Sequence, residues 1–387
     1  MIKAPFNFVP LDANIFFPSW QKQISQDVPF ESSLSGTIHV NIKAETPIFT
    51  RNGHQQGTED NEFSYYIEQG SKRFFIPGST VKGCIRSIVE IMSLGKMLPT
   101  TDSHTEENYR NSPQMLERLR ISESADLQQL SKDSLDLAEC IFGTTKDEDG
   151  LRGRVQFSHF KCTKKVAMPS DREEFRYVLN SPSPGMLPLY VRQEGCSGKY
   201  NNYDNEDLYP DEIINGWKRY ILRTGYWTKK PGKKDTVITT FRPLNKGSEF
   251  SGFIHYHNLK KEELGALLCA LTWHGEDGCY HYIGQAKPFG FGRISIRIDN
   301  SQQQPLLSYI KEFEIMMTSW IKSITEGGNP EWRKYKPIRE LFLLARTVRS
   351  WDDKKFTYME GKESKNAKKN LEYLHSLSRI LMEEKED

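Results

Sequence analysis

The stretch that decides the fold is Phe-Phe-Ile-Pro-Gly-Ser-Thr-Val-Lys-Gly-Cys-Ile-Arg, residues 74–86. It predicts a strand end, a Pro-Gly turn and a helix start, since Ser79 and Thr80 are good N-cap residues. Lys82 and Arg86 are four residues apart and therefore share one helix face. Helix-start amides favour an anion, so two cations beside the side-chain-free Gly83 indicate a phosphate-contacting helix start. The alternative is an ordinary capped surface helix.

A second motif, glycine-rich, basic and aromatic, is Gly-Gln-Ala-Lys-Pro-Phe-Gly-Phe-Gly-Arg, residues 284–293. The alternating residues 293–298 that follow predict a strand. This excludes a dinucleotide fingerprint, which requires a helix after the glycines, and no Gly-Lys-Ser/Thr closes a Walker loop. A glycine loop between strands lets the backbone approach a ligand closely, with cations for phosphates and phenylalanines for base stacking. The candidates are Lys287, Phe289, Gly290, Phe291, Gly292 and Arg293. The alternative is a tight hairpin whose phenylalanines belong to the core.

These two motifs, in this order, resemble the RAMP superfamily of CRISPR-associated RNA-binding proteins. The resemblance covers residues 35–298 and departs mildly where the family usually shows Ser-Ser-Leu and this chain has Ser79-Thr80-Val81. Further similar segments are Leu-Ala-Glu-Cys-Ile-Phe-Gly at 137–143, Gly-Leu-Arg-Gly-Arg-Val-Gln-Phe-Ser at 150–158, Phe-Ser-Gly-Phe-Ile-His-Tyr at 250–256, and residues 259–271. Residues 4–11 and 27–30 are similar to a subgroup found in type III CRISPR loci.

The hydrophobic pattern predicts an α+β chain with a ferredoxin-like (RRM-like) core, large insertions and a helical C-terminal tail. Two strand-helix-strand halves would form one mixed sheet with helices on one face. Expected strands lie at 36–47, 63–75, 155–162, 236–241, 248–257 and from 292, and expected helices at 79–98 and 260–274. The expected units are an N-terminal arm at 1–34, a RAMP domain at 35–304 with insertions at about 99–133 and 165–235, and a helical region at 305–387 with periodic segments near 306–325, 336–347 and 365–384.

Composition limits the function classes. The chain has 387 residues, with 53 Lys and Arg against 51 Asp and Glu, so a nucleic-acid binder needs a local basic patch. The six cysteines form no Cys-x-x-Cys pair, which argues against a structural zinc site. Neither a signal peptide nor a membrane-length apolar run is found. We therefore expect a cytoplasmic protein with reduced thiols and no small-molecule cofactor.

A lysine-flanked turn ends the second insertion, at residues 227–234. In the family a projecting hairpin in this part of the chain grips the guide strand. The resemblance implies that role for Lys229, Lys230, Lys233 and Lys234. A solvated charged turn is the alternative.

Two places could carry catalysis. Some RAMP backbone subunits cut target RNA with an acidic residue in the loop before the first helix, which implies Asp60 as catalytic residue and metal ligand, with Glu62 second. Carboxylates there would hold Mg²⁺, which activates the attacking hydroxyl or water. Guide-processing RAMP nucleases are metal-free and often use a loop histidine as general acid or base, which implies His54. A solvated loop is the alternative for both.

The resemblance implies a guide (crRNA)-binding backbone subunit of a type III CRISPR antiviral effector. RNA would be bound through its phosphates and sugars, because a protein that accepts any spacer cannot read bases. The implied partners are guide RNA, target RNA and other CRISPR effector subunits. A target-cutting subunit with Mg²⁺, a metal-free guide-processing endoribonuclease and a non-CRISPR interaction protein remain alternatives.

Overall fold

The computed structural model describes most of the expected core. The described residues are 2–12, 14–53, 61–97, 134–145, 150–169, 174–178, 187–190, 192–193, 215–227, 238–325, 330–347, 370 and 372–375. The predicted insertion at 99–133 lies outside them.

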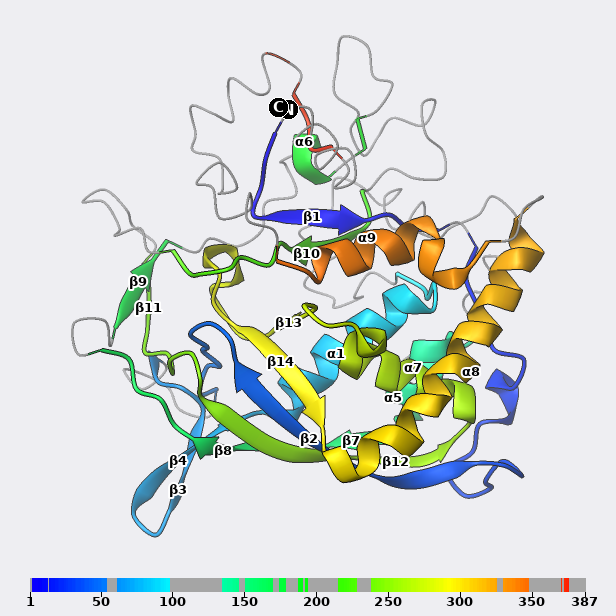
Figure 1. The fold of residues 1–387 in the computed structure, drawn as a ribbon, viewed down its shortest axis with the longest axis horizontal. Coiled ribbons are helices and arrows are strands. Elements are labelled where there is room, and N and C mark those ends of the chain that lie inside the picture. Colours follow the sequence, from blue (N-terminus) through cyan, green and yellow to red (C-terminus); the bar gives the residue numbers. More distant parts are fainter. Residues whose placement is uncertain are drawn as a thin grey trace.

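An antiparallel sheet of eight strands forms the centre of the fold (Figure 1). Its strands are β2 (Leu34–Ala44), β3 (Tyr65–Glu68), β4 (Ser71–Ile76), β7 (Val155–Phe157), β8 (Phe160–Lys164), β12 (Glu249–Leu259), β13 (His281–Tyr282) and β14 (Arg293–Ile298). The order is β13-β14-β2-β12-β8-β4-β3, with β7 also paired to β12. Every ladder in this sheet is antiparallel, so the expected mixed sheet is wrong. The reason is that no two strands joined through a helix pair in parallel: β12 lies between β2 and β8, β2 lies between β12 and β14, and β4, which leads into α1, pairs antiparallel with β8.

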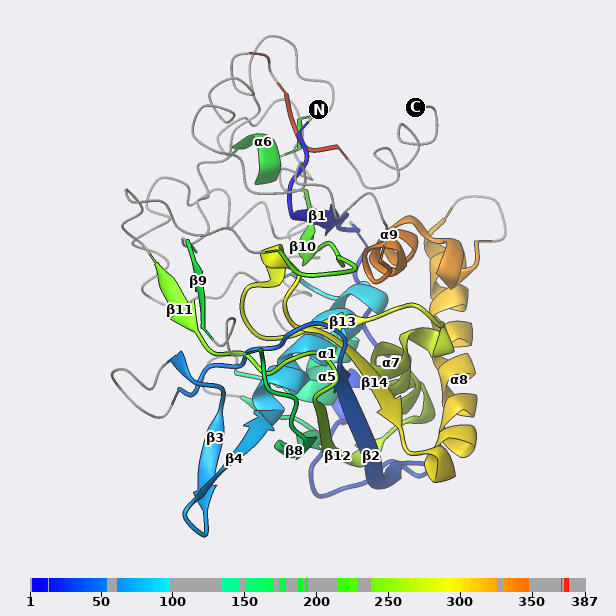
Figure 2. The same ribbon diagram turned by 60° about the vertical axis from the view of Figure 1, so that its left-hand side comes forward.

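Three helices, α1 (Gly78–Met92), α5 (Leu137–Phe142) and α7 (Lys261–Thr272), lie on one face of this sheet (Figure 2). The chain runs β2, α1, β8, β12, α7, β14, which is two strand-helix-strand units. Alternation on β2 sets the buried face: Ile38, Val40 and Ile42 are buried, whereas the residues between them are exposed. The sequence pattern therefore predicted β2, β12, β14, α1 and α7, whereas the strand expected at 155–162 is divided into β7 and β8.

The ends of α1 differ from the prediction. Its N-cap is Pro77, with no side-chain cap, so the expected capping by Ser79 and Thr80 is wrong. The amide of Gly78 instead donates to Nδ1 of His159, at 3.1 Å. The helix ends at Met92, short of residue 98.

The C-terminal region contains two described α-helices and one short 3₁₀ helix. The elements are α8 (Asn300–Ile324), η6 (Trp332–Lys334) and α9 (Lys336–Leu344), which match the periodic segments expected near 306–325 and 336–347. Trp332 is fully buried and donates through Nε1 to the carbonyl of Met92 at 2.9 Å, which ties this region to the end of α1. Of the third expected segment, 365–384, only 370 and 372–375 are described, and these residues are not helical: Leu374 forms a parallel β-bridge with Ile2, so the expected helix is wrong at these residues.

Smaller elements flank the main sheet. The N-terminal arm contributes β1 (Phe6–Val9), which pairs with β10 (Trp217–Tyr220), and η1 (Gln21–Gln23). The others are β5 (Gly143–Thr144) with β6 (Leu151–Arg152), β9 (Phe175–Tyr177) with β11 (Thr239–Phe241), α6 (Leu187–Tyr190) and η4 (Trp273–Gly275). Within the described part of the chain, no helix has the length and apolarity needed to cross a bilayer.

His281 on β13 makes the stability of this fold dependent on pH. Its Nε2–H donates to the carbonyl of Ala270 at 2.8 Å, and burial lowers its pKa to about 4. The unfolded chain therefore binds more protons between about pH 6.5 and 4, so stability is lost as the pH falls through that window. Urea unfolding should show a loss of about 3 kcal/mol from this residue between neutral pH and pH 4. His281→Gln should remove this contribution of about 3 kcal/mol to the loss, whereas substitution of the exposed His257 by Gln should leave it. Equal pH profiles for the two variants would contradict the role of His281.

Candidate nucleic-acid interface

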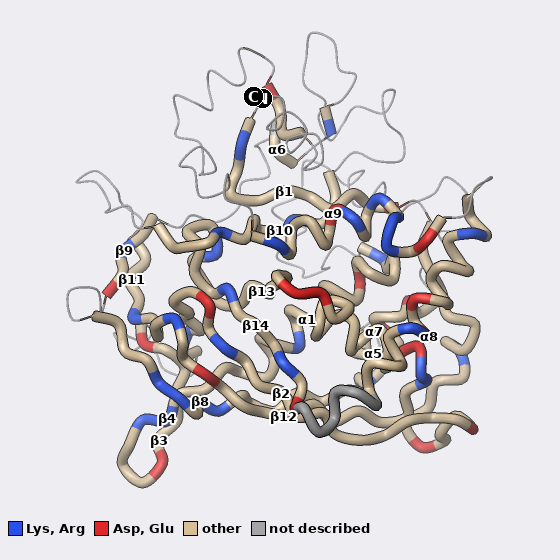
Figure 3. Tube along the Cα trace, in the orientation of Figure 1, with Lys and Arg blue, Asp and Glu red and all other residues tan. Residues whose placement is uncertain are grey.

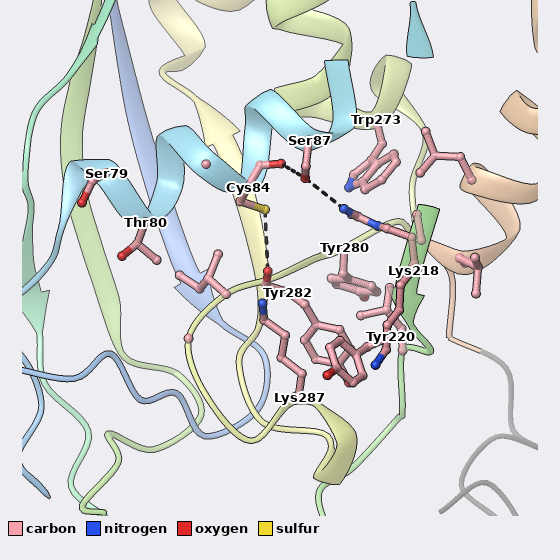
Figure 4. A pocket seen from close by; sticks show the side chains of 18 residues that line it. Ser79, Thr80, Cys84, Ser87, Lys218, Tyr220, Trp273, Tyr280, Tyr282 and Lys287 are labelled. Atoms are coloured by element: carbon pink, nitrogen blue, oxygen red, sulfur yellow. Dashed lines mark hydrogen bonds between the residues drawn. The ribbon is translucent and has the colours of Figure 1, made fainter. Parts of the chain in front are cut away.

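A cavity of about 400 Å³ lies where α1 meets the glycine-rich segment (Figure 4). The start of α1 contributes Ser79, Thr80, Gly83, Cys84 and Ser87 to its wall. The glycine-rich segment contributes Gly284 and Lys287, the latter from the short η5 (Lys287–Phe289). The thiol of Cys84 donates to the carbonyl of Tyr282 at 3.6 Å and joins the two sides. The two sequence motifs therefore lie together in space.

Cations in this cavity have no acidic neighbours, since no Asp or Glu is among the described residues that line it. Arg219, from β10, donates to the hydroxyl of Ser87 at 3.0 Å. Lys287 is half-buried, and its ammonium group makes no hydrogen bond or ion pair with any described residue. Burial lowers the pKa of Lys287, and the charge of Arg219 adds to that effect. A half-buried pair of cations without a counter-ion is suited to an anionic ligand.

Lys218 also lines the cavity, but its ammonium group has aromatic and hydroxyl neighbours. It lies 3.9 Å from the ring centre of Phe6 and donates to the hydroxyl of Tyr190 at 2.8 Å. Burial lowers its pKa to about 8. Lys218 therefore holds β10 against β1 and α6, and its charge is already satisfied by these contacts.

The predicted cation pair on α1 does not act as a pair. Arg86 forms an ion pair with Glu90 at 2.8 Å and donates to the carbonyl of Gly143 at 2.9 Å. Lys82 is half-buried, and its ammonium group has no hydrogen-bond or ion-pair partner among the described residues. Burial, and after it the charge of Arg86, lowers the pKa of Lys82. Neither residue lines the cavity. Of the predicted helix-start residues, Ser79 and Thr80 do.

Gly83 lies in the interior of α1 and is exposed. A Cβ built there would meet nothing within 4 Å, so packing does not require glycine. Glycine in a helix costs about 0.5–1 kcal/mol relative to alanine. The missing side chain opens the cavity wall, which is what close approach by a ligand needs.

The aromatic and basic residues after Lys287 belong to the core. The prediction that they stack on bases and contact phosphates is therefore wrong. Phe289 and Phe291 are 8% and 0% exposed and pack against Tyr177 and Phe175. Arg293 is buried, and its guanidinium donates to the carbonyls of Arg223, Thr224 and Glu45.

The glycines of this segment serve close backbone packing. Gly290 and Gly292 have φ of +84° and +81°, where a Cβ would lie 2.3 Å from the carbonyl oxygen of Gly225 and 1.9 Å from that of Ile283. Their conformation explains the motif without a ligand. Lys287 alone of the predicted glycine-loop residues lines the cavity.

The predicted catalytic loop is described only at its end. Glu62 forms ion pairs with Lys72 and, at 3.8 Å, with Arg242, so its carboxylate is engaged. His54 and Asp60 lie outside the described residues, as do the four lysines of the turn, Lys229, Lys230, Lys233 and Lys234. Within the described ranges, no group of three or more His, Cys, Asp or Glu side chains could hold a metal ion.

Sequence reasoning missed part of the cavity wall. Among the wall residues that were not predicted are Arg219, Tyr220, Trp273, Tyr280 and Tyr282. The run Trp217-Lys-Arg-Tyr220 was a usable signal, because cations between aromatics are typical of nucleic-acid contacts. This run lies in the segment expected to be an insertion, at about residues 165–235.

Comparison with known proteins gives one family match. The model of the RAMP superfamily matches residues 41–295, a range that includes α1, β10 and the glycine-rich segment. No curated protein matches the chain. A solved chain from a structure titled "Type IV-B CRISPR Complex" is similar at 14% identity, with 70% of this chain and 92% of that chain covered and a TM-score of 0.31. At that TM-score the similarity carries no functional conclusion.

Proposed function

This chain belongs to the RAMP superfamily, and on that premise we propose that it is a guide-RNA-binding backbone subunit of a type III CRISPR effector, with a ferredoxin-like core. Its partners would be guide RNA, target RNA and other effector subunits in the cytoplasm. Binding would be to the sugar-phosphate backbone, independent of base sequence.

The cavity at the start of α1 carries this proposal. Arg219 and Lys287 supply two positive charges, the hydroxyls of Ser79 and Thr80 supply hydrogen bonds, and no described carboxylate lines the wall. A phosphate of a single RNA strand satisfies all of these groups at once. The exposed, unencumbered Gly83 lets the strand approach the helix.

Removing both cavity cations should weaken RNA binding strongly. The double variant Arg219→Gln with Lys287→Gln loses two charge-assisted contacts and is expected to bind single-stranded RNA about 100-fold more weakly. The slope of log affinity against log salt should fall by about 1.4, since each phosphate contact on a single strand contributes about 0.7. Fluorescence anisotropy over a salt series measures both quantities.

Lys311→Gln is the matched control, because Lys311 is exposed on α8 and does not line the cavity. It should leave affinity and slope nearly unchanged. If the double variant behaves like this control while its unfolding transition is intact, the cavity is not the RNA site.

RNA cleavage by this chain stays a prediction, because its candidate catalytic residues lie outside the described ranges. A target-cutting subunit would need Asp60 and Mg²⁺, and a guide-processing nuclease would need His54 without metal. Incubating the assembled complex with labelled RNA, with and without chelator, separates these cases from a subunit that only binds.

A further inference from the structure

The main sheet has a second face, opposite the one that α1 and α7 cover, and we call it the open sheet face (Figure 2). It consists of Thr37, His39, Asn41 and Lys43 of β2; Glu249, Ser251, Phe253 and His255 of β12; Ser295 and Arg297 of β14; and Lys161 and Lys164 of β8. Strand alternation places these residues together, because their neighbours in sequence point into the core. Most of them are exposed.

Strand register aligns the polar residues of this face into a row. Asn41 pairs with Arg297 on one side and with Ser251 on the other, and Ser251 pairs with Lys161. The row therefore crosses four adjacent strands, with about 4.8 Å between neighbours. Two cations lie at its ends, and hydrogen-bonding side chains lie between them.

Beside this row lies a small aromatic platform. Phe253 is 38% exposed, and its ring centre lies 4.6 Å from that of His255. The His255 ring is held by a contact of 2.7 Å between its Nδ1 and Oγ1 of Thr37. His39 is directly across from Phe253 in the ladder. An exposed phenylalanine next to a positioned imidazole presents π-faces to solvent, as base-stacking surfaces do.

Three exposed cations lie on one side of the platform: Lys161 and Arg297 at the ends of the row through Asn41, and Lys43 one step beyond it on β2. None of them forms an ion pair with a described residue. Two carboxylates lie beside these cations. Glu249, directly across from Lys43 in the ladder, pairs with Lys164 at 3.5 Å, and Glu45 accepts from Ser295 at 2.9 Å. Figure 3 shows positive and negative positions interspersed along this part of the trace.

We propose that the open sheet face binds a second single-stranded segment of nucleic acid. Its bases stack on Phe253 and His255, and its phosphates contact Lys43, Lys161 and Arg297. The face lies across the sheet from the cavity, so this site is separate from the proposed guide site and does not depend on it. A second copy of this chain fits less well, because two such faces would bring like charges together.

Two variants test the face without touching the core. The triple variant Lys43→Ala, Lys161→Ala, Arg297→Ala removes charge. Phe253→Thr removes the stacking ring and introduces a β-branched residue that favours the strand. The probe is an oligouridine that carries 2-aminopurine. Its length of about 16 nucleotides is the upper end of typical site sizes for single-stranded nucleic acid. Binding is measured in the Arg219→Gln, Lys287→Gln background, so that loss of the cavity cannot be mistaken for loss of the face.

The triple variant should reduce affinity about tenfold or more and lower the salt slope by about two. Phe253→Thr should reduce affinity about tenfold and abolish the quenching of 2-aminopurine, while Lys311→Ala should change neither. Unchanged slope and quenching would overturn the proposal. The proposal would also be overturned if the variants changed only the self-association of the protein, measured by sedimentation. That result would assign the open sheet face to contact with a second copy of the chain. If the face variants lose RNA affinity and the cavity double variant does not, the cavity is rejected as the guide site and the open sheet face is kept as a binding site.

Discussion

Replacing Glu263 by alanine is expected to lower the free energy of unfolding by about 3–5 kcal/mol. Glu263 and Arg154 form an ion pair in which both side chains are 0% exposed. Arg154 also donates to the carbonyls of Cys140 and Asn258, and Glu263 accepts from Trp20 Nε1 at 3.0 Å. Truncation leaves a buried guanidinium without its counter-charge, and the desolvation of that charge is then uncompensated.

Chemical denaturation of three variants separates charge from packing. Glu263→Gln keeps the acceptor for Trp20 and should lose less than alanine. Arg154→Met with Glu263→Leu removes both charges and should recover most of the stability, since apolar pairs of similar volume replace buried ion pairs well. Glu262→Ala, one residue earlier on α7 and half-exposed, should stay within about 0.5 kcal/mol of the parent. A Glu263→Ala loss as small as that of Glu262→Ala would show that the pair is dispensable.

Two glycine-to-alanine changes, one in each motif, should move stability in opposite directions. Gly292→Ala is expected to cost at least about 2 kcal/mol, because the residue has φ of +81° and its Cβ would lie 1.9 Å from the carbonyl oxygen of Ile283. Gly83→Ala should stabilise by about 0.5–1 kcal/mol, because α1 has room for the methyl group. Thermal unfolding measures both.

The same Gly83→Ala variant should nevertheless weaken RNA binding by about tenfold, since its methyl group narrows the cavity where a strand approaches α1. Higher stability with weaker binding identifies a glycine kept for the ligand. Higher stability with unchanged binding would mean that nothing approaches the helix at this position. Ser323→Ala, in the exposed last turn of α8, is the matched control and should not alter binding.

The sequence by itself determined the elements and the family. The alternation in residues 36–47 and the apolar stripe of 260–274 predicted β2 and α7, because a strand repeats every two residues and a helix every 3.6. The paired motifs indicated the RAMP superfamily, and the family match over residues 41–295 confirms it.

Only the tertiary structure decided which cations are available. Arg293 and Lys287 look equally suitable in the sequence, yet Arg293 donates to carbonyls of Glu45, Arg223 and Thr224, whereas Lys287 lines the cavity without a described partner. Arg219 reaches that cavity because β10 pairs with β1. Local patterns determine backbone shape and the buried face, but a side chain's partners come from segments far away in the chain. That is why the sequence predicted where the two motifs begin, and the fold determined which of their residues can meet a ligand.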